Sequence, residues 1–304
     1  MTPKTPVAFV LSGGASLGAI QVGMLRALYE RSIKPDLIVA TSVGAINGAF
    51  IASRPQTLET ADELAAIWRQ VRRGHVFPLN PLSGLLGFFG SRSHLVPDSG
   101  LRRLLASHVE RERLEQLPIP LHVVAVDVVS GDELLLSSGP LVDAVMASAA
   151  IPAVLPPVGW GDRELVDGGV ANNTPISHAI ELGAREIYVL PTGHSCALAD
   201  PPGSALGMAL HALSLLTHSR LIADIELHKS RAKLIVLPPP CPQSIAPIDF
   251  GHAAELIERS AEDARAFLGA GAGEPPPRRK RQPPRRRTGV RNCPRTSPRE
   301  HAAL

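Results

Sequence analysis

The sequence predicts an α/β protein in which a mostly parallel β-sheet is covered by helices. Short apolar runs typical of strands alternate along the chain with segments whose apolar residues have helical spacing. The strand-like runs are apolar throughout, unlike the strands of a sheet with one solvated face. Of the 304 residues, 44% are hydrophobic and 19% charged, which is enough apolar material for a sizeable buried core.

The elements expected in the first half of the chain follow this alternation. The apolar run Val7–Leu11 predicts the first strand, and it is too short for the hydrophobic region of a signal peptide. Apolar residues at helical spacing then predict a helix over Ala19–Arg31. The further expectations are a strand at Leu37–Ala40, helices at Ala45–Ser53, Thr57–Arg73 and Asp98–Ser107, and strands at Leu121–Val129 and Glu133–Leu136.

The second half continues the pattern and then becomes mostly helical. We expect a short helix over Leu141–Ala149, a helix from Pro175 to Leu182, a strand at Glu186–Leu190, and helices at Ala205–Leu227 and Ala253–Leu268 joined through Leu234–Leu237. The segment Ala205–Leu216 is apolar on several faces, which suits either a wall of an acyl groove or core packing, and we favour core. No uncharged stretch of about 18 apolar residues is present, which predicts no membrane span.

Charge is distributed unevenly along the chain. Residues 274–304 hold nine Arg and one Lys against two Glu, a net charge of +8, whereas the rest of the chain carries −5. This Pro-rich tail has almost nothing to bury, so we expect it to be disordered. It is either a solvated extension or an electrostatic contact for an anionic membrane surface. No aromatic residue lies among its charges, which argues against base stacking with nucleic acid.

The three cysteines, Cys196, Cys241 and Cys293, lie far apart in the sequence. They form neither a disulfide framework nor a zinc-spaced pair, which suits a reducing compartment. We therefore expect a cytoplasmic protein that can contact a membrane from one side. No pattern of metal-ligating residues is present, so no metal is expected.

Two loops follow the first two strands and carry residues suited to acyl-transfer chemistry. The loop Ser12–Gly18 reads SGGASLG, and its backbone N–H groups at a helix N-terminus suit an anion or an oxyanion. It is neither a Walker A loop nor a dinucleotide fingerprint. Ser42 lies in ATSVG between a strand and a helix, where small residues at Ala40 and Gly44 favour a nucleophile elbow. The alternative for Ser42 is a helix cap.

A third loop, LVDGGVANNTP at Leu165–Pro175, places an acidic residue at the end of a short apolar run. Gly168 and Gly169 would let the chain turn away from Asp167, although Asp-Gly is also a plain turn. A nucleophilic serine needs a base and hydrogen-bond donors for the developing charge. Ser42 could be the nucleophile and Asp167 its base, and the N–H groups around Gly13, Gly14 and Ala15 could be the hydrogen-bond donors.

The segments LSGGASLGAIQVGML, ATSVGAING and LVDGGVANNTPI, in this order and spacing, resemble the patatin-like phospholipase family, as does ASAAIPAVLPPV at Ala147–Val158. The resemblance implies a three-layer α/β/α fold and lipid acyl hydrolysis without metal or organic cofactor. By position it implies Ser42 as nucleophile, Asp167 as proton acceptor, Gly13, Gly14 and Ala15 as the oxyanion loop, and Gly18, Ala40, Gly44, Gly168 and Gly169 as supporting residues. We expect the hydrolase domain over residues 7–198, a helical extension packed on it over 199–270, and the tail over 271–304.

This sequence departs from the family pattern at three positions. Ala15 stands for a glycine of the oxyanion loop, Leu17 for a basic residue, and Ala40 for the first glycine of the elbow. The loss of the basic residue removes a positive charge that would face a phospholipid head group. These departures motivate the alternative of a lipid-binding protein with weak or no turnover.

Histidines and a second apolar loop leave two further interpretations open. A Ser–His–Asp esterase would use His194, His211, His218 or His252, although none of them has a distinctive sequence context. The segment Asn80–Val96 holds Leu and Phe among glycines, which suits either a lid over an acyl groove or ordinary core filling.

Overall fold

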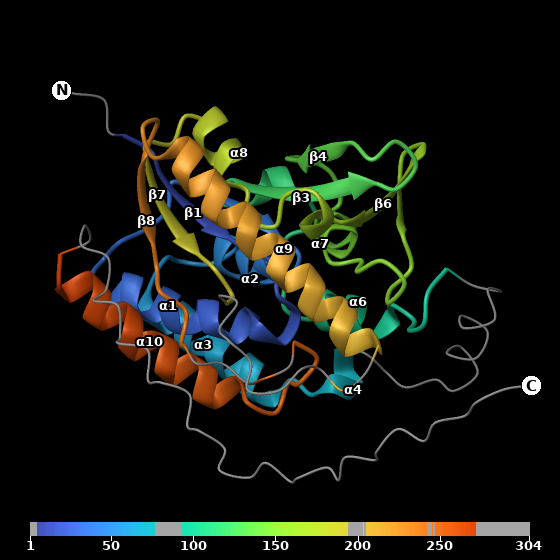
Figure 1. Ribbon diagram of the computed structural model, residues 1–304, viewed down its shortest axis with the longest axis horizontal. Coiled ribbons are helices and arrows are strands. Elements are labelled where there is room, and N and C mark those ends of the chain that lie inside the picture. The colour runs from blue at the N-terminus through green and yellow to red at the C-terminus, as the bar shows by residue number, and fades with distance from the viewer. Residues whose placement is uncertain are drawn as a thin grey trace, which may run out of the picture. The chain divides into compact units, whose positions relative to one another are not determined.

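The computed structural model describes residues 5–76, 93–193, 203, 205–241, 245 and 247–271 (Figure 1). Most of the expected lid segment, the basic tail, His194, Cys196 and Cys293 lie outside these residues. Cys241 is held in a disulfide, so the expectation that the cysteines stay unpaired is wrong for this residue. Residues Met1–Gly273 form one compact unit and Glu274–Leu304 a second.

An eight-stranded sheet with the order β5-β6-β3-β2-β1-β7-β8 forms the centre of the first unit, and β4 pairs with β3. The strands β3, β2, β1, β7 and β8 run parallel, and β4, β5 and β6 make the antiparallel pairs. The prediction of a mostly parallel sheet is therefore confirmed. The strands are β1 (Val7–Leu11), β2 (Leu37–Thr41), β3 (Leu121–Asp127), β4 (Glu133–Leu136), β5 (Val158–Trp160), β6 (Arg163–Asp167), β7 (Glu186–Leu190) and β8 (Lys233–Val236).

Helices cover both faces of this sheet, which gives three layers (Figure 1). Alternate residues of β1 point to opposite sides: Phe9 and Leu11 join the core under the helices of one face, and Ala8 and Val10 join the core under α8 and α9. The first face is covered by α1 (Gly18–Glu30), α2 (Val43–Ala52), α3 (Leu58–Gln70), α6 (Ser99–Ala106), α7 (Leu141–Ser148) and α10 (Ala253–Gly269), with the short α4 (Arg73–Val76) beside α6. The second is covered by α8 (Ile176–Glu181) and α9 (Ala205–His228).

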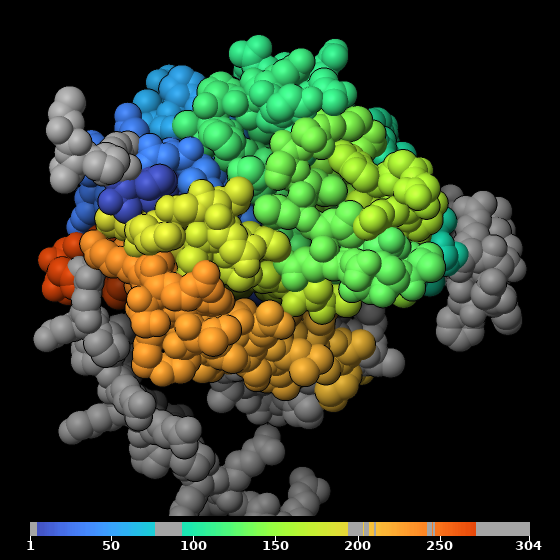
Figure 2. Space-filling view, turned by 90° about the horizontal axis from the view of Figure 1, so that it is seen from above, coloured from blue at the N-terminus to red at the C-terminus, as the bar shows by residue number. Residues whose placement is uncertain are grey.

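The segment after residue 198 adds a strand to the sheet as well as helices. Strand β8 pairs with β7 from Glu186↔Lys233 to Val189↔Val236, and α10 packs along α1. The expectation that Ala205–Leu216 packs as core is wrong, because Met208, Leu213, Leu215 and Leu216 are exposed. Figure 2 shows α9, in orange, on the surface next to α8, in yellow. Among the described residues, no helix is long and apolar enough to cross a bilayer.

Candidate active site

Ser42 occupies the single position between β2 and α2. Its backbone has φ 55° and ψ −124°, a region that costs a non-glycine residue roughly 1–3 kcal/mol. The Ser42 N–H donates to Ser148 Oγ at 2.8 Å, which helps to hold this conformation. Gly44 is required because a Cβ there would lie 2.3 Å from the Leu11 carbonyl oxygen. The tight turn therefore places the Ser42 hydroxyl at the N-terminus of α2, where the helix dipole favours negative charge.

Asp167 ends strand β6 and lies directly against Ser42. The Ser42 hydroxyl donates to Asp167 Oδ2 at 2.6 Å, and the Gly169 N–H donates to Asp167 Oδ1 at 2.7 Å. Gly168 lets the chain turn under β3, since a Cβ there would lie 2.3 Å from the Val124 carbonyl oxygen. The structure thus brings together the serine and the carboxylate that the sequence separates by 125 positions.

Burial sets the charge preference of this carboxyl group. Asp167 is 6% exposed, and loss of water raises its pKa from 3.8 to about 6, against the opposing effect of the hydrogen bonds from Ser42 and Gly169. Near neutral pH the group is ionised. It is also a stronger base than an aspartate in water.

The glycine loop lies beside Ser42 but offers fewer free donors than the sequence predicts. The Gly13 N–H donates to the Asn173 carbonyl at 3.2 Å, so this conformation does not leave it free for an oxyanion. For the N–H groups of Gly14 and Ala15 the described residues provide no acceptor. Ala15 has φ 51°, a left-handed conformation in which an alanine is strained. These two N–H groups remain candidates for the oxyanion hole.

A chain of buried side-chain hydrogen bonds supports the loop from below. Thr192 Oγ1 donates to the Gly13 carbonyl at 2.5 Å, and Gln21 Nε2 donates to the Ser12 carbonyl at 2.8 Å. Asn47 then donates to Gln21 Oε1 and accepts from Trp68 Nε1. This network could not be predicted from the sequence, because polar residues inside apolar helical patterns carry no signal of their partner.

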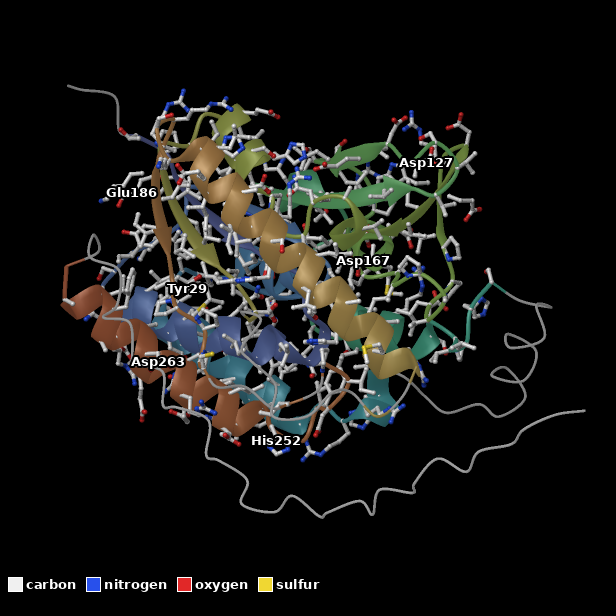
Figure 3. All side chains as sticks on the ribbon, in the orientation of Figure 1. Tyr29, Asp127, Asp167, Glu186, His252 and Asp263 are labelled. Carbon is white, nitrogen blue, oxygen red and sulfur yellow. The ribbon has the colours of Figure 1, made fainter. Side chains whose placement is uncertain are left out.

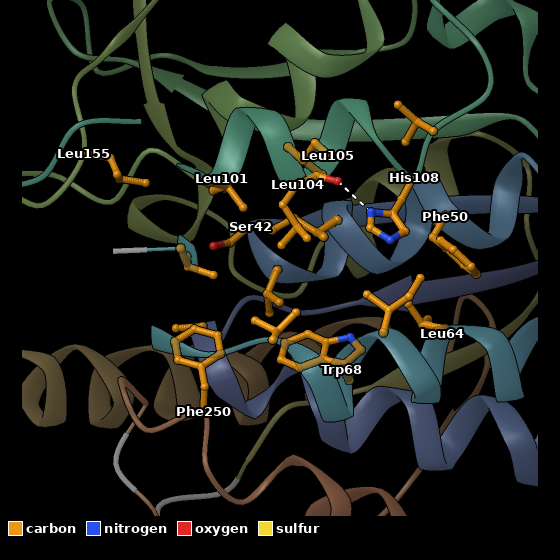
Figure 4. Close-up of a pocket in the computed structure, with 18 of the residues that line it drawn as sticks. Ser42, Phe50, Leu64, Trp68, Leu101, Leu104, Leu105, His108, Leu155 and Phe250 are labelled. Carbon is orange, nitrogen blue, oxygen red and sulfur yellow. Dashed lines mark hydrogen bonds between the residues drawn. The ribbon is translucent and has the colours of Figure 1, made fainter. Parts of the chain in front are cut away.

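Ser42 lines an apolar pocket with a volume of about 80 Å³ (Figure 4). Its walls come from α2, α3 and α6 and from the segment after α7, and Figure 4 shows Ser42 separated from Phe50 and His108 along it. The lining residues are Ala15, Ser42, Val43, Ile46, Phe50, Leu64, Ile67, Trp68, Val71, Val76, Leu101, Leu104, Leu105, His108, Val109, Ala149, Ile151, Leu155 and Phe250. Nothing in the sequence of α6 indicated that it faces the site.

The direct Ser42–Asp167 contact leaves no place for a histidine between the two side chains. Of the proposed histidines, His211 and His218 lie on α9, and His252 is half-exposed next to Asp249 and Glu255. His108 is the histidine that lines the pocket, where its Nδ1 lies 2.8 Å from the Leu104 carbonyl oxygen. Among the described residues, no group of His, Cys, Asp and Glu could hold a metal ion.

Comparison with known proteins matches the patatin-like phospholipase family model to residues 9–180. The chain is 28% identical over 196 residues to patatin-like phospholipase domain-containing protein 7 of Rattus norvegicus, covering 62% of this chain and 14% of the relative. It is 30% identical over 172 residues to an uncharacterized NTE family protein of Mycobacterium tuberculosis, covering 55% and 27%. The chain thus spans a minor part of both relatives.

Among solved structures, human GIVD cytosolic phospholipase A2 in complex with methyl gamma-linolenyl fluorophosphonate matches with a TM-score of 0.49 and 10% identity. The match covers 88% of this chain and 58% of that chain.

The raised pKa of Asp167 predicts a pH-dependent stability cost. Folding raises the pKa of the Asp167 carboxyl group from 3.8 to about 6, so the folded state is favoured when this group is protonated. This contribution to the free energy of unfolding is lost as the pH rises through about 6. Asp167→Asn cannot ionise. It should raise the free energy of unfolding at about pH 8 by up to roughly 3 kcal/mol and much less at about pH 4. Urea unfolding across this range measures the difference, and a difference that does not vary with pH would contradict the assignment.

Proposed function

The chain belongs to the patatin-like phospholipase family, whose model matches more than half of its residues, and we propose that it is a serine acyl hydrolase acting on lipid esters. One observation carries the proposal: the Ser42 hydroxyl, which lines an apolar pocket, donates to the buried Asp167 carboxylate at 2.6 Å. A nucleophile, its base and a site for an acyl chain are thereby adjacent.

In the first step, Ser42 Oγ attacks the ester carbonyl carbon while Asp167 takes the hydroxyl proton. The negative charge moves to the carbonyl oxygen, which the N–H groups of Gly14 and Ala15 and the N-terminus of α2 stabilise. The bond to the alcohol breaks, and Asp167 returns the proton to the departing oxygen. The products are the free alcohol and an ester of Ser42.

In the second step, a water molecule gives a proton to Asp167, and its oxygen attacks the acyl carbon. The bond between Ser42 Oγ and the acyl carbon then breaks, and the proton returns to the serine. The fatty acid leaves, and the enzyme has its starting protonation. One carboxylate thus serves both steps, so no third residue is needed to orient a histidine.

The pocket supports a single acyl chain as the group that is transferred. Val43, Ile46 and Phe50 follow one face of α2 away from Ser42 and line the pocket. Eight residues of helix separate Ser42 from Phe50, which is about 12 Å. An extended chain of about ten carbons, with zigzag bonds of about 1.5 Å, has this length. Because a volume of about 80 Å³ is smaller than such a chain, the lining side chains must move apart to admit it. We therefore propose acyl groups of medium length as the best substrates.

Replacement of the proposed nucleophile should abolish turnover. Ser42→Ala should lower kcat for a nitrophenyl ester by at least about 10³-fold and should prevent labelling by a fluorophosphonate, because no hydroxyl remains to attack. Ser53→Ala is the matched control, since Ser53 is equally buried at 6% and, among the described residues, its hydroxyl bonds to the Phe50 carbonyl and to Arg54. A purified protein that hydrolyses no ester, or a Ser42→Ala variant as active as its parent, would contradict the proposal. The first result would favour a lipid-binding protein.

The base should give the reaction a defined dependence on pH. Because Asp167 must be ionised to accept a proton, kcat/KM should be half its maximum at about pH 6 and should fall about tenfold per pH unit below that. The profile should be measured with a soluble ester, with circular dichroism at each pH to show that the fold is intact. A flat profile between about pH 5 and pH 8 would exclude a base with this pKa.

Acyl preference should follow the length of the pocket along α2. Ile46→Trp places a large ring one turn from Ser42, and the ratio of kcat/KM for decanoyl to butyryl esters should fall about tenfold or more. Phe50→Ala makes room at the end of the pocket that lies away from Ser42. It should raise the ratio of kcat/KM for palmitoyl esters to kcat/KM for decanoyl esters. The ratios cancel changes in the amount of active enzyme. Unchanged ratios in both variants would show that the acyl chain does not follow α2.

A further inference from the structure

Helix α9 is much longer than the strands it connects. Its 24 residues span about 36 Å, whereas the five residues of β7 and four of β8 span roughly 13–17 Å. It joins the carboxyl end of β7 to the amino end of its parallel neighbour β8, so it runs against the strand direction. Its amino-terminal half therefore extends beyond the carboxyl edge of the sheet (Figure 1).

The burial of side chains along α9 agrees with this geometry. Leu221, Asp224 and His228, which lie one turn apart on one face, are buried and belong to the carboxyl-terminal half. In the amino-terminal half and the residues that follow it up to Ser219, none of the described side chains is buried. The carboxyl-terminal end of the helix thus packs on the molecule, whereas the described side chains of the projecting half are only half-buried or exposed.

The projecting half is apolar and carries no full charge. Between Gly203 and Ser219 the sequence holds no Asp, Glu, Lys or Arg. The exposed fractions of its large side chains are 47% for Met208, 38% for Leu213, 43% for Leu215 and 69% for Leu216. Contiguous exposed apolar residues of this kind mark an interaction site in a monomeric protein.

The same edge of the sheet holds the candidate active site. Ser42 and the glycine loop follow the carboxyl ends of β2 and β1, and Thr192, which bonds Gly13, follows the carboxyl end of β7. The projecting half of α9 begins only 13 residues after Thr192. The lipid substrate proposed above has to leave a lipid phase before its ester reaches Ser42.

From these observations we infer that the amino-terminal half of α9 is a docking face that enters the surface of an anionic lipid bilayer. The face offers aliphatic and Met side chains without the Trp, Tyr or Arg anchors that dominate protein–protein interfaces. Shallow apolar insertion alone binds weakly, and stable association needs a second signal. The +8 charge of residues 274–304 supplies that signal for anionic lipid, which the −5 charge of the rest of the chain would otherwise oppose.

Two exposed leucines of α9 make a matched test. Leu216 is 69% exposed on the projecting half, and Leu227 is 67% exposed eleven residues later, about 16 Å further along a similar side of the helix. Full-length Leu216→Glu and Leu227→Glu would be sedimented with vesicles of phosphatidylcholine and phosphatidylserine in equal parts, and with phosphatidylcholine alone. Leu216→Ser serves as a milder second variant, and melting temperatures are measured for all.

We expect Leu216→Glu to weaken partitioning onto the mixed vesicles about tenfold or more, Leu216→Ser to weaken it less, and Leu227→Glu to change it less than about twofold. Binding of the parent should be weaker on phosphatidylcholine alone and should fall with added salt. Equal losses at the two positions, or none at Leu216, would overturn the inference. So would a dimer that Leu216→Glu dissociates, seen by light scattering, without a change in vesicle binding.

This inference depends on the proposed function only for the reason that a lipid surface is needed, and the two can fail separately. Hydrolysis of a soluble butyryl ester tests the proposed function and should be the same in the parent, Leu216→Glu and Leu227→Glu. Retained ester hydrolysis with unchanged vesicle binding would refute the docking face alone. Loss of ester hydrolysis in the parent would refute the proposed function.

Discussion

The hydrogen bond between Ser42 and Asp167 is the contact on which the arrangement of the active-site edge depends. Figure 3 labels Asp167 among the side chains of the whole molecule. Ser42 follows β2 and Asp167 ends β6, and both strands pair with β3, so the register of one strand sets both positions. Two close approaches complete the geometry: α2 lies against the carbonyl of Leu11, and the turn after β6 lies against that of Val124. A side chain at Gly44 or Gly168 would push the two groups apart.

This arrangement makes the site less stable than its surroundings. The Ser42 backbone lies in a region that glycine prefers, Ala15 has a left-handed conformation, and a carboxylate is enclosed by apolar residues. The core on both faces of the sheet offsets these costs, because β1 and β2 are buried almost throughout and the helices around them share one apolar cluster. The same strain and burial hold the hydroxyl toward the pocket and raise the basicity of Asp167.

How far the sequence predicted this structure depends on the range of each interaction. Most of the strands, the mostly parallel character of the sheet and the turn at Ser42 follow from local patterns, so they could be predicted without coordinates. The hydrogen bond from the Gly13 N–H to the Asn173 carbonyl could not be predicted, because it depends on how two loops 160 positions apart meet. The exposure of Leu216 was also beyond local patterns: a helix that is apolar on several faces predicts core only when its neighbours extend as far as it does. Here the sheet ends before the helix does.

The features at the carboxyl edge share one physical requirement, which is to move an apolar chain without exposing it to water. The pocket at Ser42 is apolar over its whole length, so an acyl chain gains free energy inside it only in proportion to the water contact it loses. If the chain first crossed bulk water, the transfer cost would be set against that gain. The docking face proposed on α9 would lower this cost, because it would bring the lipid surface to the edge of the sheet that holds Ser42. The exposed apolar part of α9 and the apolar lining beside Ser42 lie on opposite faces of the sheet and would serve this same requirement from its two sides.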